Sequence, residues 1–403
     1  MKLLSNLSWQ HAAAVSMLVF SVVSPIKTGV SATAVSFGPA CFDTITSDTT
    51  LDDDLTCVCG NDASALVVVG PAMLDLGGYT VSCSDTNTPD NTFGVEIQGI
   101  GATVKNGHVT GAYYGVGGGL NGPVSNSLIK NVRTDFNIYG IFLFFSDGNK
   151  ITEVSVTDNI VVGILSLGGS DNVISNNHVA DTALFEGIAF VGNGNKVIGN
   201  TVLNSLEWDC IGISPIDDEF DSFPIGNVIK NNIVSGCGDA GLSVYANNTI
   251  VSGNEISDTT RSGILISHTG NKVVDNHIMR AGNDGIGIIT GDAVVKGNLI
   301  EDTFKDAIDI QPRSGNAEVK GNTIVNCGAE GIQVRSDGNV VKGNVISGCE
   351  TGIDVIDAKG NNDIKGNVVT GSIFDDLADA NVDCGTNKWK GNDGDGNQDC
   401  TEE

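Results

Sequence analysis

Apolar and polar residues alternate with a period of two in short stretches along most of the chain. Ile286 and Ile288 flank a glycine, and Ile308 and Ile310 flank an aspartate one repeat later. This alternation predicts short strands that bury one face. Segments rich in Gly and Asn separate the strands, and both residues accept the backbone angles of tight turns. The pattern therefore predicts an all-β chain.

The strands belong to a repeat that reads Gly-Asn-x-Ile, then six to eight residues, then Gly-Ile-x-Val. A period of about 22 residues is too short for two packed helices and fits three strands with three turns, which is one turn of a solenoid. We predict about 12 turns, with stacked Asn side chains bonding from turn to turn. The first landmark stands at Gly107, Asn131, Val154, Asn177, Asn200, Asn232, Asn254, Asn276, Asn298, Asn322, Asn344 and Asn367. The second stands at Gly140, Gly163, Gly187, Cys210, Gly241, Gly263, Gly285, Ala307, Gly331 and Gly352.

These repeats, preceded by the stretch from Leu74 to Val81, resemble the right-handed parallel β-helix superfamily of pectate-lyase-like proteins, the pectin lyase fold. The resemblance covers about residues 65–375 and implies a single-stranded right-handed parallel β-helix with capped ends. That superfamily includes polysaccharide lyases, uronan epimerases, glycoside hydrolases, tailspikes and adhesins. The Asp-Pro-His-Asp stretch of alginate epimerases is missing here, as is the Asp-Asp and Gly-His-Gly pair of polygalacturonases. The resemblance therefore implies a fold and no particular reaction.

The ends of the chain differ from the repeats. Residues 1–34 combine Lys2, an apolar stretch over 12–23 and the small residues Ala32 and Ala34, which is typical of a secretory signal; a short uncleaved anchor is the alternative. We assign 35–84 to an N-terminal cap containing Cys, 85–375 to the β-helix and 376–403 to a C-terminal cap. The predicted location is secreted, periplasmic or on the cell surface, with no integral membrane segment after signal removal.

Composition and charge narrow the partners. The chain has 53 Gly and 40% hydrophobic residues, which excludes a disordered chain, and its net charge of −28 disfavours nucleic acid. The predicted partner is a polysaccharide or another glycan. Ten Cys favour disulfides over zinc, because Cys57 and Cys59 are spaced too closely for a common zinc site. Cys327 and Cys349 lie one repeat apart and are expected to be neighbours.

The candidate chemistry lies just before the second landmark. In register, one column holds Glu186, Asp209, Ala240, Ser262, Asp284, Asp306 and Glu330. The position before it holds Trp208, Asp239, Arg261, Asn283, Lys305 and Ala329. Adjacent turns lie about 4.8 Å apart. Asp284 and Asp306 should therefore lie side by side, and Asp239 should lie beside Arg261.

Two neighbouring carboxyls raise one another's pKa or share a cation. The first option suits general acid and base catalysis, and the second suits Ca²⁺ that holds a uronate while Arg or Lys acts as base. The predicted catalytic residues are Asp284, Asp306, Asp209, Arg261 and Lys305. The predicted substrate-binding residues are Trp208, Asp239, His268, Asp309, Arg313 and Arg335. Ca²⁺ at Asp284 and Asp306 is the one predicted cofactor.

Two features should shape a groove around these residues. The turn from Ser214 to Gly226 is about nine residues longer than its counterparts and should form a wall, and Gly287 should leave the strand face open. The function that this predicts is a secreted or periplasmic carbohydrate-active protein, either a polysaccharide lyase, an epimerase or a hydrolase. The alternative is a non-catalytic surface, adhesion or glycan-binding β-helix, whose acids form an exposed, charge-compensated ladder.

Overall fold

The computed structural model describes residues 38–60, 63–84, 92–214, 223–356, 360–381 and 385–396. The predicted signal segment 1–34 lies outside these residues. Within them every regular element is a strand, and none is a helix long and apolar enough to cross a membrane.

The strands stack into three parallel sheets, which we name A, B and C. Sheet A is formed by β1 (Asp43–Ile45), β4 (Leu66–Val69), β7 (Phe93–Ile100), β9 (Tyr114–Gly118), β12 (Tyr139–Phe144), β15 (Val162–Leu167), β18 (Ile188–Phe190), β21 (Ile211–Ile213), β24 (Leu242–Tyr245), β27 (Ile264–Ser267), β30 (Ile286–Gly291), β33 (Ile308–Ser314), β36 (Glu330–Val334), β39 (Thr351–Val355) and β42 (Leu377–Asp379), with β10 (Val124–Ser125) added beside β7.

Sheet B is formed by β2 (Thr49–Thr50), β5 (Met73–Asp75), β8 (Thr103–Thr110), β11 (Leu128–Asp135), β13 (Lys150–Thr152), β16 (Val173–Ser175), β19 (Lys196–Ile198), β22 (Val228–Lys230), β25 (Ile250–Ser252), β28 (Asn271–Val274), β31 (Ala293–Lys296), β34 (Glu318–Lys320), β37 (Val340–Lys342), β40 (Asp363–Lys365) and β43 (Lys388–Lys390). Sheet C is formed by β3 (Leu55–Cys57), β6 (Thr80–Cys83), β14 (Ser155–Thr157), β17 (His178–Thr182), β20 (Thr201–Ser205), β23 (Ile233–Cys237), β26 (Glu255–Thr259), β29 (His277–Ala281), β32 (Leu299–Thr303), β35 (Thr323–Cys327), β38 (Val345–Ser347) and β41 (Val368–Thr370), and the long strands β8 and β11 serve both sheets.

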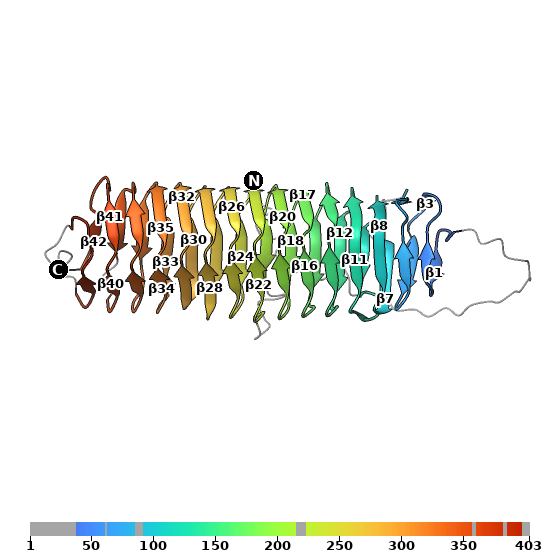
Figure 1. The fold of residues 1–403 in the computed structure, drawn as a ribbon, viewed down its shortest axis with the longest axis horizontal. Coiled ribbons are helices and arrows are strands. Elements are labelled where there is room, and N and C mark those ends of the chain that lie inside the picture. Colours follow the sequence, from blue (N-terminus) through green and yellow to red (C-terminus); the bar gives the residue numbers. More distant parts are fainter. Residues whose placement is uncertain are drawn as a thin grey trace, which may run out of the picture.

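The chain visits the sheets in the order A, B, C, and successive turns lie side by side along a rod (Figure 1). This is the predicted all-β parallel solenoid. It has about 14 turns where the repeats predicted about 12. The difference arises because the segments assigned to the two caps also contribute stacked strands: β1 pairs with β4 at one end, and β42 pairs with β39 at the other.

One continuous hydrophobic core runs through the rod. It extends from Ile45 to Trp389, and equivalent positions of successive turns stack on one another, as Ile286 does on Ile308. Both side chains are fully buried, which confirms the strand faces predicted from the alternation. The strand pairings also place the second landmark in one column, from Gly140 to Gly352, as predicted.

Asn side chains bond from turn to turn at the bends. The predicted ladder between sheets B and C is present from Asn177 to Asn367, with each backbone N–H donating to the amide oxygen of the next turn. The assignment of Asn131 to this ladder was wrong: Val132 pairs with Gly107, and Asn131 is an exposed residue within β11 whose φ is positive.

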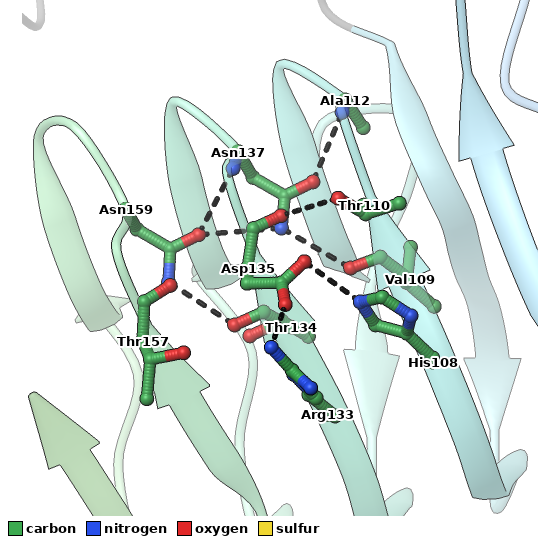
Figure 2. Close-up of polar contacts among 10 residues, drawn as sticks. All are labelled: His108, Val109, Thr110, Ala112, Arg133, Thr134, Asp135, Asn137, Thr157 and Asn159. Atoms are coloured by element: carbon green, nitrogen blue, oxygen red, sulfur yellow. Dashed lines mark hydrogen bonds and ion pairs between the residues drawn. The ribbon is translucent and has the colours of Figure 1, made fainter.

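Further bends carry the same device, which the sequence reading missed. Asn149 begins a ladder between sheets A and B, and Asn137 bonds to Asn159 between sheets C and A (Figure 2). The Asn ladders satisfy backbone groups that the bends would otherwise leave buried without a partner.

The cysteines form disulfides, as predicted. The bonds join Cys41 to Cys57, Cys59 to Cys83, Cys210 to Cys237 and Cys327 to Cys349. Every cysteine of the described residues is therefore oxidised, and the zinc alternative does not hold for them. Cys384 and Cys400 lie outside these residues.

Candidate functional site

The corner between sheets C and A carries the predicted polar columns. The acidic column directly precedes the second landmark, where the strands of sheet A begin, and contains Glu186, Asp209, Asp284, Asp306 and Glu330. The corner column precedes it by one residue and contains Trp208, Asp239, Arg261, Asn283, Lys305 and Ala329. Backbone bonds connect the corner column from turn to turn, because Arg261 N donates to Asp239 O, Asn283 N to Arg261 O and Lys305 N to Asn283 O. The periodic register thus brings together residues that are far apart in the sequence.

Asp284 and Asp306 lie on adjacent turns, as predicted, but they are not exposed. Their relative exposures are 5% and 6%. Asn283 Nδ2 donates to Asp284 Oδ2 at 2.9 Å, and Glu330 N donates to Asp306 Oδ1 at 3.1 Å. The predicted exposed ladder is therefore wrong at these two positions, because each carboxyl folds back onto neighbouring groups.

Burial decides the protonation of this pair. Desolvation, followed by the charges of Asp309 and Asp306, raises the pKa of Asp284 to about 7. Desolvation and a hydrogen bond with the Glu330 carboxyl raise the pKa of Asp306 to about 7. The charge of Asp306 acts on Asp284, whereas the carboxyl that acts on Asp306 is that of Glu330. Both members of the Asp284–Asp306 pair therefore change between their protonated and charged forms near neutral pH.

Asp309 lies beside this pair on the outer face of β33. It is 1% exposed and forms a two-point ion pair with Arg335, whose Nε donates to Asp309 Oδ1 at 2.9 Å. Lys305 is exposed and forms no ion pair with a described residue, although its charge lowers the pKa of Asp284. The strand face at Gly287 is not open as expected, because Leu265 Cδ2 lies 2.8 Å from where a Cβ would be.

A second carboxyl pair lies nearer the N-terminal end of the same column. Burial, followed by the charge of Asp209, raises the pKa of Glu186 to about 8, and burial raises the pKa of Asp209 to about 6. Asp209 Oδ1 accepts a hydrogen bond from Ala240 N at 2.9 Å. Glu186 extends over Gly212, where a Cβ would meet Glu186 Oε1 at 3.1 Å, and Glu186 Oε2 has no hydrogen-bond partner.

Between the two carboxyl pairs the corner is partly neutralised. Arg261 Nη1 lies 3.4 Å from Asp239 Oδ2, as the register predicted. Trp208 is partly buried, and its ring lies 5.4 Å from that of Phe185. The predicted site residues therefore form two separate pairs of acids, with the Arg261–Asp239 ion pair between them, rather than one centre.

Two predicted residues lie apart from these groups. His268 is at the opposite edge of sheet A, directly after β27, where its ring packs 3.7 Å from that of Phe223 and burial lowers its pKa. Arg313 is exposed on β33 and pairs in register with Thr290. Most of the long turn, residues 215–222, lies outside the described residues, so the expected groove wall stays a prediction.

The described surface offers no preformed calcium cage at the predicted place. No group of three or more His, Cys, Asp or Glu in the described ranges is arranged to hold a metal ion. Two hollows occur elsewhere on the rod, one lined by residues such as Arg280 and Phe304 and the other by residues such as Asp75 and Arg133. The carboxyls of the acidic column line neither of them.

Another buried acid, Asp135, is fully engaged. His108 Nε2 lies 2.7 Å from Asp135 Oδ1, and Arg133 lies 2.6 Å from Oδ2 (Figure 2). Burial acts to raise the pKa of Asp135, but the bond to His108 and the nearby positive charges outweigh it and lower the pKa. This network gives His108 a structural role in the solenoid.

The sequence reading passed over some residues of this face. Glu186 and Glu330 were placed in the acidic column without a role, although both influence its protonation. A set of aromatic residues that continues the column toward the N-terminus was not noticed. Extending the same register from Val162 to Tyr139 and Tyr114, by steps of 23 and 25 residues, would have found it.

Comparisons with known proteins agree with the fold. The family model for a right handed beta helix region matches residues 222–369. The A-modules of mannuronan C-5 epimerases AlgE6 and AlgE4 of Azotobacter vinelandii are similar to this chain with TM-scores of 0.57 and 0.56 at 15% and 16% identity. The alignments cover 80% and 76% of this chain, and 90% and 88% of theirs.

The periplasmic alginate epimerase AlgG is similar with a TM-score of 0.51 and 15% identity, over 77% of this chain and 73% of its own. No curated protein has a sequence that matches this chain. At these identities the similarity concerns the right-handed parallel β-helix alone.

Proposed function

We propose that this right-handed parallel β-helix is a secreted or periplasmic enzyme that acts on a polysaccharide, with acid and base catalysis at Asp284 and Asp306. The observation that carries the proposal is this pair of adjacent, nearly buried carboxyls whose pKa values are both raised to about 7. Catalytic acids and bases work best when their pKa lies near the operating pH. The four disulfides support an oxidising compartment.

The pair suits hydrolysis of a glycosidic bond. The protonated carboxyl gives its proton to the leaving oxygen as the bond to the anomeric carbon breaks. Water then adds its oxygen to that carbon and gives a proton to the charged carboxyl, so that the pair recovers its shared proton. Lys305 lies close enough to influence Asp284 and would moderate the charge that develops there.

Lyase and epimerase chemistry has less support. Both remove a proton next to a uronate carboxylate, which requires a cation to neutralise that carboxylate. Arg335 is held by Asp309 and Arg261 by Asp239. Because the similar structures include alginate epimerases, the test below also measures the products of these reactions. That similarity concerns the fold.

Calcium at Asp284 and Asp306 stays a prediction that these residues fit poorly. Ca²⁺ takes six to eight oxygen ligands, and the described residues contain no group of three acids or histidines that could hold a metal. A proton held by this pair near neutral pH also competes with a cation for the carboxyl oxygens. We therefore expect melting temperature and activity to be unchanged by a chelator.

The direct test is a screen of the purified protein on alginate, polygalacturonate and uncharged polysaccharides, measuring new reducing ends and unsaturated products. Asp306→Asn should lower the hydrolytic rate by at least about 100-fold and keep the circular dichroism spectrum. Glu350→Gln, an exposed acid two turns away on the same corner, is the matched control and should retain activity. Full activity of the Asp306→Asn variant would refute the assignment.

A non-catalytic glycan-binding role is the second candidate. Asp209 and Asp306 each accept a backbone N–H of the following turn, which is a bond that supports the solenoid without any chemistry. This candidate predicts binding of a glycan by wild type and by Asp306→Asn alike, with no product from either.

A further inference from the structure

The outer face of sheet A changes character along the rod. The acidic column continues toward the N-terminus through Val162, Tyr139, Tyr114 and Phe93, which pair in register. Aromatic rings thus occupy the positions on early turns that carboxyls occupy on later ones. Tyr114 stacks on Phe142 with ring centroids 4.4 Å apart and lies 5.2 Å from Tyr139.

These rings are not part of the solenoid core. Ile141 and Leu143 point into the core, so Phe142 and Phe144 between and beyond them lie on the outer face of β12. The rings form a separate hydrophobic cluster that includes Leu165. Its rim is partly exposed and holds Tyr113, Tyr139, Phe144, Val161, Leu167 and Phe185. We call this surface the aromatic face.

The aromatic face lies outside the core of the solenoid, and the core is already filled without it. Contiguous apolar surface of this kind marks a binding site more often than chance exposure does. The aromatic face ends at the Phe185–Trp208 contact, directly beside the Glu186–Asp209 pair. It therefore leads into the acidic column, in which Asp284 lies three turns beyond Asp209.

A buried polar atom at this junction points to the chemistry of the occupant. Glu186 is 2% exposed, and its Oε2 has no hydrogen-bond partner. Gly212 leaves space for the Glu186 side chain to lean across the strand. A ligand that offers apolar faces to the rings and hydroxyls to this carboxyl would satisfy both surfaces. A pyranose ring has both features, since its C–H faces pack on aromatic rings and its hydroxyls lie around the edge.

The charge of this face favours uncharged sugars over uronates. Along this face Arg261 is paired with Asp239 and Arg335 with Asp309, and the whole chain carries a net charge of −28. A polyuronate would meet the charge of Asp209 and the net negative charge of the chain with few unpaired cations to receive it, which opposes binding. An uncharged chain meets no such repulsion.

We propose that the aromatic face binds an uncharged polysaccharide, with Tyr113, Tyr139, Phe185 and Trp208 as successive stacking positions that lead the chain to the carboxyls. The proposal deepens the proposed function and rests on it for the direction in which the chain runs. It assigns these four residues to binding and leaves acid and base catalysis to Asp284 and Asp306.

The test measures binding of uncharged polysaccharides, such as β-glucans, xylans and mannans, beside alginate and polygalacturonate, using affinity electrophoresis. Wild type should bind at least one uncharged polymer and neither uronan. Tyr113→Ala and Trp208→Ala should each weaken binding about tenfold. Phe374→Ala removes an exposed ring near the C-terminal end, 71% exposed, and should bind like wild type. Melting curves check that each variant is folded.

The outcomes separate this proposal from the proposed reaction. Binding that depends on Tyr113 and Trp208, without any product, would support the aromatic face and refute catalysis. Hydrolysis that is indifferent to both substitutions would refute the aromatic face alone. Binding of uronans only would overturn the uncharged substrate class, and no interaction with any glycan would overturn both proposals.

Discussion

At Asp284 and Asp306 the protein places two carboxyls where the repeat elsewhere tolerates Ala240 and Ser262. The two acids lose water contact without gaining a cation at hydrogen-bond distance among the described residues. Burial therefore favours their protonated forms. Burial raises the pKa of Asp309 as well, but the bound Arg335 guanidinium opposes that rise. The immediate partners of neighbouring acids thus decide how strongly burial is opposed at each of them.

Stability should consequently fall as the pH rises from about 4 to 8. The folded-state pKa of Asp284, about 7, exceeds the ordinary value of 3.8, so between these values the folded state binds more protons than the unfolded state. The contribution is fully present below the unfolded pKa and is lost as pH passes the folded pKa. Asp284→Asn should flatten this dependence and raise the unfolding free energy at pH 8 by about 1–4 kcal/mol. Urea unfolding at several pH values measures it, and an unchanged slope would contradict the assignment.

Arg335 should be costly to remove. Arg335→Met leaves Asp309 buried without its counter-charge, and we expect a loss of about 3–5 kcal/mol at pH 8. Arg280→Met is the matched control, because its ion pair with Asp258 is half exposed and its loss should cost much less stability than the loss of Arg335. The double variant Asp309→Asn with Arg335→Met should regain part of the loss. Equal effects of the two Arg substitutions would show that burial of Asp309 is unimportant.

Among the repeated elements, the bends contribute hydrogen bonds between turns in addition to those of the strands. Many strands contain only three residues, such as β22 and β25, and their ladders are correspondingly short. The Asn side chains at the bends extend the bonding between turns beyond the strand ends. Asn276, for example, accepts from Asn254 N and donates to Val251 O.

Asn276→Ala should therefore destabilise the rod by at least about 2 kcal/mol, because it leaves a buried donor and a buried acceptor without partners. Denaturant unfolding followed by circular dichroism measures the change. Glu255→Ala on the adjacent β26 alters an exposed side chain and should change stability by less than about 0.5 kcal/mol. A loss that matches this control would mean that water replaces the ladder.

Over the whole molecule the charge is unbalanced, with 49 acidic residues against 21 Lys and Arg. Self-repulsion of the folded rod is long-ranged, and dissolved salt screens it over about 10 Å at 0.1 M. The unfolded chain spreads the same charge over a larger volume. Melting temperature should accordingly rise between about 0.01 M and 0.5 M NaCl and respond equally to KCl. A constant melting temperature would show that local pairs already neutralise the repulsion.

The repeat made much of this arrangement predictable. In a solenoid, residues one period apart are neighbours in space, so counting 22–24 residues was enough to place Asp284 beside Asp306, Asp239 beside Arg261 and Cys327 beside Cys349. The same counting fails where the turn lengths are irregular, which is why the position of Asn131 was wrong by one residue.

The direction in which side chains lean was decided by the tertiary structure. Periodicity assigns a residue to a column, but rotamers and neighbours decide whether its side chain reaches water, the next turn or the next column. Glu186 leans over Gly212, and Leu265 covers Gly287, and neither contact follows from spacing. Burial of the carboxyls, and with it their protonation, depends on these contacts, because desolvation is set by all the atoms that surround a group and not by its position in the repeat.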